Sequence, residues 1–257
     1  MGPQLSQLPD PVASNESNAD PVSRTCLGIA TGRVTMTSRI RAITFDAYGT
    51  LFDVHSVIAI CSRKFPGQGA ELSKLWRAKQ LEYAWLRSLM GRYEDFWRVT
   101  ESALAFACNS LSLACPAETR RELMESYLHL DIFPEVKPAL GKLAEYNLAI
   151  LSNGSPKMLA AAVESAGLKG IFADVISADE VKTYKSSPRV YSLVSKHLGV
   201  SKSAIAFVSS NFWDIAGAKS YGFFTCWVNR CNLAEDELGV KPDVTVQNLD
   251  RLSSVLE

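Results

Sequence analysis

No apolar run in the sequence approaches the roughly 18–20 residues that a helix needs to cross a bilayer. The longest apolar runs are short pieces such as residues 148–151 and 204–208. The chain also lacks a surplus of charge of either sign, since 27 Lys and Arg are balanced by 27 Asp and Glu among its 257 residues. Binding to nucleic acid or to an anionic membrane surface requires a basic excess somewhere in the chain. We therefore expect neither a membrane partner nor a nucleic-acid partner.

Two further patterns are missing. No two of the six cysteines stand in the C-x-x-C spacing of zinc and redox motifs, and a disulfide framework is untypical of a chain of this length. We therefore expect reduced thiols in a cytoplasmic protein. No G-x-S-x-G string occurs, and the three histidines lie outside the motifs described below, which argues against an esterase triad built on histidine.

The first 36 residues contain no aromatic side chain and hold four of the eleven prolines. Such a segment cannot bury enough apolar surface to offset the entropy lost on ordering, so we expect residues 1–36 to form a disordered extension. The segment also lacks the basic and apolar regions of a secretory signal. Two alternatives stay open for it: a transit peptide, against which its acidic residues count, and an addition upstream of a natural start at Met36.

Beyond residue 39, short apolar runs alternate with helical patterns. The runs are residues 40–45, 148–151, 175–176, 204–208 and 223–228, and helical patterns fill residues 157–166 and 189–198. Alternating apolar strands and helices are typical of an α/β fold with a doubly wound parallel sheet. Because ligands bind beyond the carboxyl ends of the strands in such sheets, Asp46, Ser152 and Ser209 should converge at one edge.

One region interrupts this alternation. From about residue 53 to residue 130 there is no strand candidate, and apolar side chains recur at helical spacing over residues 72–90 and again over 93–111. Pro116 suits the first turn of a third helix that reaches Leu130. We therefore predict a helical cap inserted after the first strand, at residues 53–131, on a core formed by residues 37–52 and 132–257.

The most informative segment is FDAYGTLF at residues 45–52. An aspartate at a strand end followed by a tight Gly-Thr turn places a carboxylate where a substrate can reach it, and carboxylates act as covalent nucleophiles in some enzymes. Taken alone, Asp46 could equally be a helix cap or a turn residue.

Here the sequence resembles the haloacid dehalogenase superfamily, whose first motif is D-x-D-G-T or D-x-Y-G-T after the first strand. Ser152-Asn153-Gly154 is similar to the second motif of that superfamily, Lys185 to the third, and SSNFWD at residues 209–214 to the fourth. The resemblance is closer still to the L-2-haloacid dehalogenases, in the runs FDAYGTLFDVHSV (45–57), LWRAKQLEYAWLRSLMGRY (75–93), ILSNGSP (150–156), FVSSNFWD (207–214) and TCWVNR (225–230). It covers residues 39–251.

Two missing groups separate this sequence from the phosphatases of the superfamily. Those enzymes need Mg²⁺, which prefers carboxylate ligands, and a second aspartate two positions after the nucleophile. Here that position holds Tyr48, and Asp214 is the one acidic residue in the fourth motif. Chloride and bromide leave without a proton, so the loss of an acid and of a metal site suits halide displacement. We therefore expect no metal and no cofactor.

The resemblance implies that Asp46 attacks C2 of an (S)-2-haloalkanoate, and that water then hydrolyses the aspartyl ester to give an (R)-2-hydroxyalkanoate. Asp214 would accept a proton from that water, oriented by Asn211, Ser209 and Lys185. Ser152 and the backbone at Ala47 and Tyr48 would bind the substrate carboxylate, and Arg77 and Asn153 the departing halide. The remaining expected residues are Tyr48, Leu81, Phe96 and Trp213, as an apolar wall around the alkyl group, and Thr50, Tyr191 and Ser210, as hydrogen-bonding supports.

Two positions depart from the family pattern, since Ser186 replaces the usual proline after Lys185 and Ala78 replaces a frequent glutamine after Arg77. The expected partners are a small 2-haloacid, water and, by resemblance, a second copy in a homodimer. Two other functions stay open: a Mg²⁺-dependent phosphatase of the same fold, and a binding protein that retains the pocket without turnover.

Overall fold

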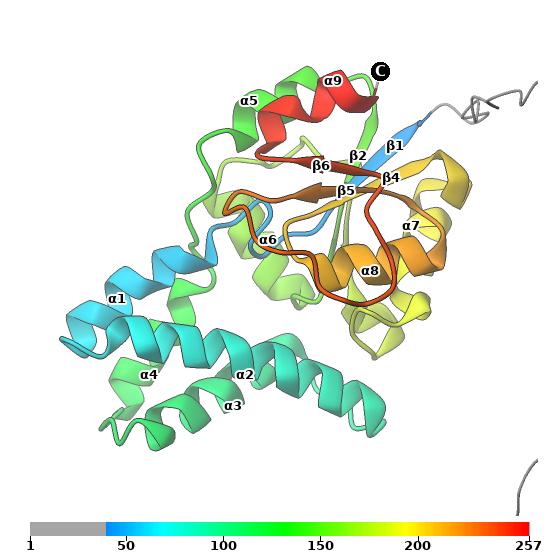
Figure 1. Cartoon of the computed structure of the whole chain (residues 1–257). Coiled ribbons are helices and arrows are strands. Elements are labelled where there is room, and N and C mark those ends of the chain that lie inside the picture. Colours follow the sequence, from blue (N-terminus) through cyan, green and yellow to red (C-terminus); the bar gives the residue numbers. More distant parts are fainter. Residues whose placement is uncertain (1–39, 257) are drawn as a thin grey trace, which may run out of the picture. The chain divides into compact units, whose positions relative to one another are not determined.

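Six parallel strands form one sheet in the computed structural model, which describes residues 40–256 (Figure 1). Their order across the sheet is β3-β2-β1-β4-β5-β6. The strands are β1 (Ala42–Phe45), β2 (Asn147–Ser152), β3 (Asp174–Ser177), β4 (Ile205–Ser209), β5 (Phe224–Val228) and β6 (Val244–Val246). The predicted doubly wound α/β fold is confirmed, with β6 as a strand that the sequence patterns did not predict. The predicted disordered extension, residues 1–36, lies outside the described residues.

The register of the central strands explains why functional side chains meet. Phe45, the last residue of β1, pairs with Ile150 of β2 on one side and with Val208 of β4 on the other. The polar residues that follow these strands therefore meet at one edge of the sheet. Every residue of β1 and β4 is buried, as expected for strands covered on both faces.

Helices cover both faces of the sheet (Figure 1). Helices α5 (Val136–Lys142) and α9 (Leu252–Leu256) lie on one side, and α7 (Pro188–Leu198) and α8 (Phe212–Tyr221) lie on the other. Helix α6 (Pro156–Ser165) begins with a proline after Ser155, whose hydroxyl accepts a hydrogen bond from the backbone of Met158. Four short 3₁₀ segments complete the core and its junctions: Val54–Ser56, Ala178–Val181, Lys202–Ala204 and Leu249–Arg251.

Four helices occupy the stretch for which we predicted a cap. They are α1 (Val57–Lys64), α2 (Gly69–Leu89), α3 (Phe96–Ser110) and α4 (Ala117–Ser126). Helices α2 and α3 pack side by side, and the Trp76 indole donates a 2.8 Å hydrogen bond to the carbonyl of Thr100. The predicted third helix differs in its ends: Pro116 is its N-cap rather than a first-turn residue, and it ends at Ser126 because residues 127–129 form turns.

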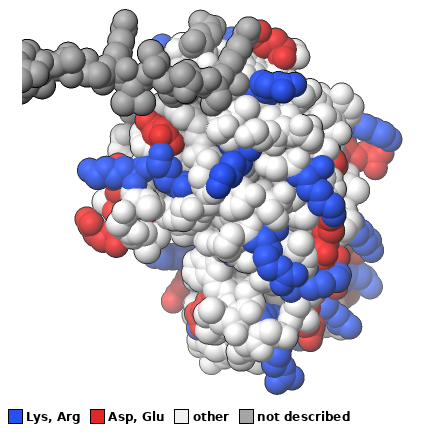
Figure 2. All heavy atoms as spheres, turned by 90° about the vertical axis from the view of Figure 1, so that its right-hand side faces the viewer, with Lys and Arg blue, Asp and Glu red and all other residues white. Residues whose placement is uncertain are grey.

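The charged surface residues and the cysteines of the structure match what the composition indicates, namely balanced charge and unpaired thiols. Figure 2 shows basic and acidic side chains interspersed with uncharged ones on one face of the molecule. None of the helices found between residues 40 and 256 combines the length and the apolar character that crossing a membrane requires. The described cysteines, Cys61, Cys108, Cys115, Cys226 and Cys231, carry free thiols.

Candidate active site

The turn after β1 fixes the predicted nucleophile at the edge of the sheet. The carbonyl of Ala47 accepts hydrogen bonds from the backbone N–H groups of Thr50, Leu51 and Phe52, at 3.2, 2.9 and 3.0 Å. Gly49 adopts a φ of +91°, a left-handed conformation that side chains disfavour. The Gly-Thr pair therefore turns the chain sharply directly after Asp46.

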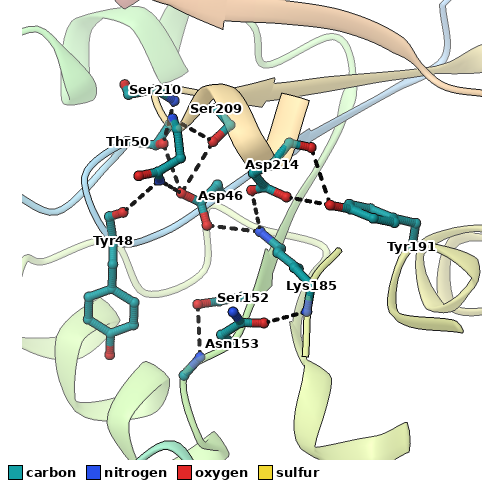
Figure 3. A network of polar contacts seen from close by, with 12 residues as sticks. Asp46, Tyr48, Thr50, Ser152, Asn153, Lys185, Tyr191, Ser209, Ser210 and Asp214 are labelled. Carbon is teal, nitrogen blue, oxygen red and sulfur yellow. Dashed lines mark hydrogen bonds and ion pairs between the residues drawn. The ribbon is translucent and has the colours of Figure 1, made fainter. Parts of the chain in front are cut away.

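The two oxygens of the Asp46 carboxylate have different surroundings (Figure 3). Oδ1 accepts one hydrogen bond, from Nζ of Lys185 at 2.9 Å. Oδ2 accepts from the Thr50 hydroxyl at 3.0 Å, from Nδ2 of Asn211 at 2.8 Å and from the Ser209 hydroxyl at 3.4 Å. The Thr50 hydroxyl itself accepts from the backbone N–H of Ser210 at 2.9 Å, which directs its hydrogen toward Asp46. One oxygen thus faces a cation and the other faces three neutral donors.

A second carboxylate shares the same lysine. Nζ of Lys185 lies 2.8 Å from Oδ2 of Asp214, and the Tyr191 hydroxyl donates to Oδ1 of Asp214 at 2.8 Å. Burial raises the pKa of Asp214 to about 6, against the opposing attraction of Lys185. Burial alone would lower the pKa of Lys185, but Asp214 and Asp46 together outweigh it and hold that pKa above its usual value. Lys185 therefore stays protonated between the two acids.

The second predicted motif borders the lysine from the other side. Oδ1 of Asn153 accepts a 2.9 Å hydrogen bond from the backbone N–H of Lys185. The Ser152 hydroxyl accepts from the backbone N–H of Gly154 at 3.1 Å, and the Ser152 side chain is fully buried. Lys185 keeps these contacts although Ser186 replaces the proline expected after it.

Arg77, on helix α2, reaches the turn of residues 47–52, which we call the nucleophile turn after the role predicted for Asp46. Its Nη2 atom lies 3.4 Å from the carbonyl oxygen of Tyr48, to which Asn211 also donates at 3.1 Å. Nη1 of Arg77 donates to the buried Gln80 at 2.6 Å. Together with Leu81, which also lies on α2, Arg77 borders a cavity of about 290 Å³ whose walls include Gly49, Ser210 and Asn211.

The four residues predicted as an apolar wall lie in three places. The Tyr48 ring points away from the Asp46 carboxylate in Figure 3 and lies 6.2 Å from the ring of Phe96. Leu81 borders the cavity beside Arg77. The Trp213 ring packs 5.4 Å from that of Trp85, and both border a cavity of about 670 Å³ whose wall includes Lys185.

Two residues near the site were missed at the sequence level. Gln80 positions Arg77 and donates to the Thr100 hydroxyl at 2.7 Å, and its place three residues after Arg77 on a helix was an available signal. Arg230 contacts the nucleophile turn itself, donating to the carbonyl of Thr50 at 3.0 Å. The run TCWVNR marked its segment without giving it a role.

The donor set does not fit a magnesium ion. Mg²⁺ needs carboxylate oxygens as ligands, but one oxygen of Asp46 and one of Asp214 bind the Lys185 ammonium, and the other oxygen of each accepts hydrogen bonds from neutral donors. Within residues 40–256 there is no cluster of three or more His, Cys, Asp or Glu side chains arranged to hold a metal.

Comparison with known proteins gives consistent matches over most of the chain. Residues 40–222 match the family model of haloacid dehalogenase-like hydrolases. The chain is 50% identical over 220 residues to an (S)-2-haloacid dehalogenase of Pseudomonas sp. (strain YL), covering 85% of this chain and 95% of that protein. It is 48% identical over 216 residues to haloacetate dehalogenase H-2 of Moraxella sp. (strain B), covering 83% and 96%. A solved structure of L-2-haloacid dehalogenase from Xanthobacter autotrophicus with chloropropionic acid covalently bound superposes with a TM-score of 0.81 at 40% identity, covering 84% of this chain and 98% of that one.

Proposed function

This chain belongs to the haloacid dehalogenase-like hydrolases, in their L-2-haloacid dehalogenase branch, and on that premise we propose that it hydrolyses (S)-2-haloalkanoic acids to (R)-2-hydroxyalkanoic acids. The reaction proceeds through an ester on Asp46 and uses no metal or cofactor. The observation that carries this proposal is the unequal environment of the buried Asp46 carboxylate, with one oxygen on Lys185 and the other on three neutral donors.

In the first step Oδ1 of Asp46 attacks C2 of the substrate. The three donors on Oδ2 occupy the lone pairs of that oxygen, whereas Oδ1 accepts a single hydrogen bond, from Lys185, and is therefore the oxygen that attacks. A C–O bond forms, the carbon–halogen bond breaks in line behind it, and the halide leaves with the bonding electrons. The configuration at C2 inverts once, and an ester joins C2 to Asp46.

In the second step water attacks Cγ of Asp46. Negative charge then develops on Oδ2, where the donors from Thr50, Asn211 and Ser209 already stand and need no reorganisation. Asp214 takes the proton of the water. It lies close to Asp46, because both carboxylates bind the same Lys185 ammonium, and its pKa of about 6 leaves it ionised at neutral pH. The intermediate collapses by breaking the bond between Cγ and Oδ1, and the departing alkoxide takes the proton back from Asp214 to leave as the hydroxy acid. Loss of the remaining proton to solvent restores the Asp46 carboxylate.

The substrate is held by charge and by apolar contact. Ser152 and the backbone N–H groups at Ala47 and Tyr48 receive its carboxylate, while Arg77 and Asn153 stabilise the departing halide. Leu81 borders the cavity beside Arg77, and Trp213 borders the cavity beside Lys185. Together with Tyr48 and Phe96 they offer apolar contact to the alkyl group. Residues of the proposed cap thus complete a site whose other residues lie in the α/β core.

We further propose that the enzyme works in the cytoplasm as a homodimer, with a cap at residues 53–131 and without a nucleic-acid partner.

Halide release from both enantiomers of 2-chloropropionate, with and without EDTA, tests this function. We expect chloride release from the (S) enantiomer at a rate that EDTA does not change, and no comparable release from the (R) enantiomer. Hydrolysis of a phosphomonoester that depends on added Mg²⁺, in place of chloride release, would instead identify a phosphatase. Tight binding of haloacid without any turnover would identify a binding protein.

A further inference from the structure

Arg230, which follows β5, joins the two segments that supply the donors around Asp46. Its Nη1 atom donates to the Ser210 hydroxyl at 2.8 Å and to the carbonyl of Gly49 at 3.3 Å. Its Nη2 atom donates to the carbonyl of Thr50 at 3.0 Å. One guanidinium group therefore bridges the nucleophile turn and the segment that follows β4.

The guanidinium group is itself held from a third segment. Oε1 of Glu135 accepts from Nε of Arg230 at 2.8 Å and lies 2.7 Å from Nη2, and the Phe133 ring stacks 3.8 Å from the guanidinium carbon. The two charged side chains are only 16% and 14% exposed. The planar fork of arginine presents several donors in fixed directions, which a single ammonium group cannot reproduce. The geometry of this contact is therefore specific to arginine.

The bridged segments carry the donors on Oδ2 of Asp46. Thr50 belongs to the nucleophile turn, whereas Ser209 and Asn211 flank Ser210. We propose that Arg230 is a positioning residue that keeps these donors in register for hydrolysis of the Asp46 ester, an inference that rests on the proposed function. Arg230 acts through Thr50 and Ser210, since its own hydrogen bonds go to the turn carbonyls, Ser210 and Glu135 rather than to Asp46.

The two chemical steps depend differently on these donors. In the first step negative charge leaves the Asp46 carboxylate, so hydrogen bonds to Oδ2 weaken as the ester forms. In the second step charge builds on Oδ2, so the same hydrogen bonds strengthen. Loosening the donors should therefore slow ester hydrolysis more than ester formation, and the covalent ester should accumulate.

Arg230→Met tests this role, with Lys219→Met as a matched control. Lys219 forms a partly buried ion pair with Asp243 at 2.6 Å and lies outside the proposed site. For Arg230→Met we expect kcat for (S)-2-chloropropionate to fall about 10- to 100-fold. KM should fall with kcat, because only the second step is slowed, so kcat/KM should change little. The intact mass of protein quenched with acid at steady state should show the covalent ester. Lys219→Met should keep the kcat and KM of the wild type and show no ester.

Arg230→Lys keeps a cation beside Glu135, and it is the variant to measure if Arg230→Met does not fold. Since one ammonium group cannot bridge both segments, this variant should also accumulate ester, with a smaller loss of kcat. Unchanged kcat in a folded Arg230 variant, or a fall in kcat/KM without ester, would overturn the role of Arg230 while wild-type turnover upholds the proposed function. Absence of turnover by the wild-type protein would overturn both.

Discussion

The Nζ atom of Lys185 lies 2.9 Å from Oδ1 of Asp46, and both side chains are almost completely shielded from solvent. Burying an ion pair is costly unless hydrogen bonds satisfy both charges, and here Asp214 supplies the second contact to the ammonium. The lysine also opposes the burial that raises the pKa of Asp214. One buried lysine thus links Asp46, the proposed nucleophile, to Asp214, the proposed base.

Arg77→Ala should impair halide release more than it impairs folding. Arg77 contacts the carbonyl of Tyr48 and the buried Gln80, so its loss removes a cation from the wall beside the nucleophile. We expect kcat/KM for (S)-2-chloropropionate to fall roughly 100-fold, the usual effect of removing one charge-stabilising donor. Steady-state chloride release measures this. Lys79→Ala is the control, because Lys79 pairs with Glu82 on the same helix; equal rates for Arg77→Ala and the control would remove Arg77 from the site.

Lys185→Met should move the acid limb of the pH–rate profile to higher pH. Asp214 is proposed to serve as a base when ionised, so activity should be present above its pKa and be lost as the pH falls through it. Burial raises that pKa to about 6, and Lys185 is the strongest influence that lowers it. Removing the lysine should therefore raise the pKa further and also reduce kcat at neutral pH.

The profile of kcat against pH from 4.5 to 9 measures that shift, on the order of one pH unit or more. Lys182→Met is the control. Lys182 lies three residues before Lys185, and its exposed ammonium group forms an ion pair with Asp179. An acid limb at the same pH in Lys185→Met as in the control would contradict the role assigned to the lysine.

Gly154→Ala should destabilise the fold. A Cβ atom at Gly154 would lie 2.8 Å from Cε2 of Tyr48 and 3.0 Å from Cδ2 of Leu159, and both neighbours are buried. We expect the free energy of unfolding to drop by about 1–3 kcal/mol, the usual cost of overpacking. Urea denaturation measures it, with Gly141→Ala as the control.

At Gly141, inside helix α5, an added Cβ meets no atom within 4 Å. Its replacement by alanine should be neutral or stabilise the fold by up to about 1 kcal/mol. Equal unfolding free energies for the two variants would show that the Tyr48 ring moves aside without cost.

The sheet and the meeting of polar residues at its edge could be predicted because they follow from local patterns. Short apolar runs ending in polar residues indicate buried parallel strands, and strand adjacency then brings Asp46 to within 3.4 Å of Ser209. Strand β6 was missed because its three residues have threonine in the middle and form a partly exposed edge. Helix α1 was likewise missed, because its eight residues make little more than two turns, too few for an apolar pattern to recur at helical spacing.

Other features of the site depend on tertiary packing that no local pattern encodes. The Tyr48 ring packs against Phe96 and Tyr127, which come from distant segments of the predicted cap. The role proposed for Arg230 depends on the meeting of three segments around one guanidinium group, whereas the sequence shows only an arginine after a strand. Spacing along a helix, by contrast, could have linked Gln80 to Arg77.

The most direct test of the account is a single turnover in water labelled with heavy oxygen, with enzyme in excess over (S)-2-chloropropionate. Because water is proposed to attack Cγ of Asp46, the label should appear in the Asp46 carboxylate, and the lactate released in that turnover should be unlabelled. Asp46→Asn should release chloride at least about 1,000-fold more slowly while remaining folded. Label found in the first lactate and absent from the peptide that contains Asp46 would contradict covalent attack by this residue.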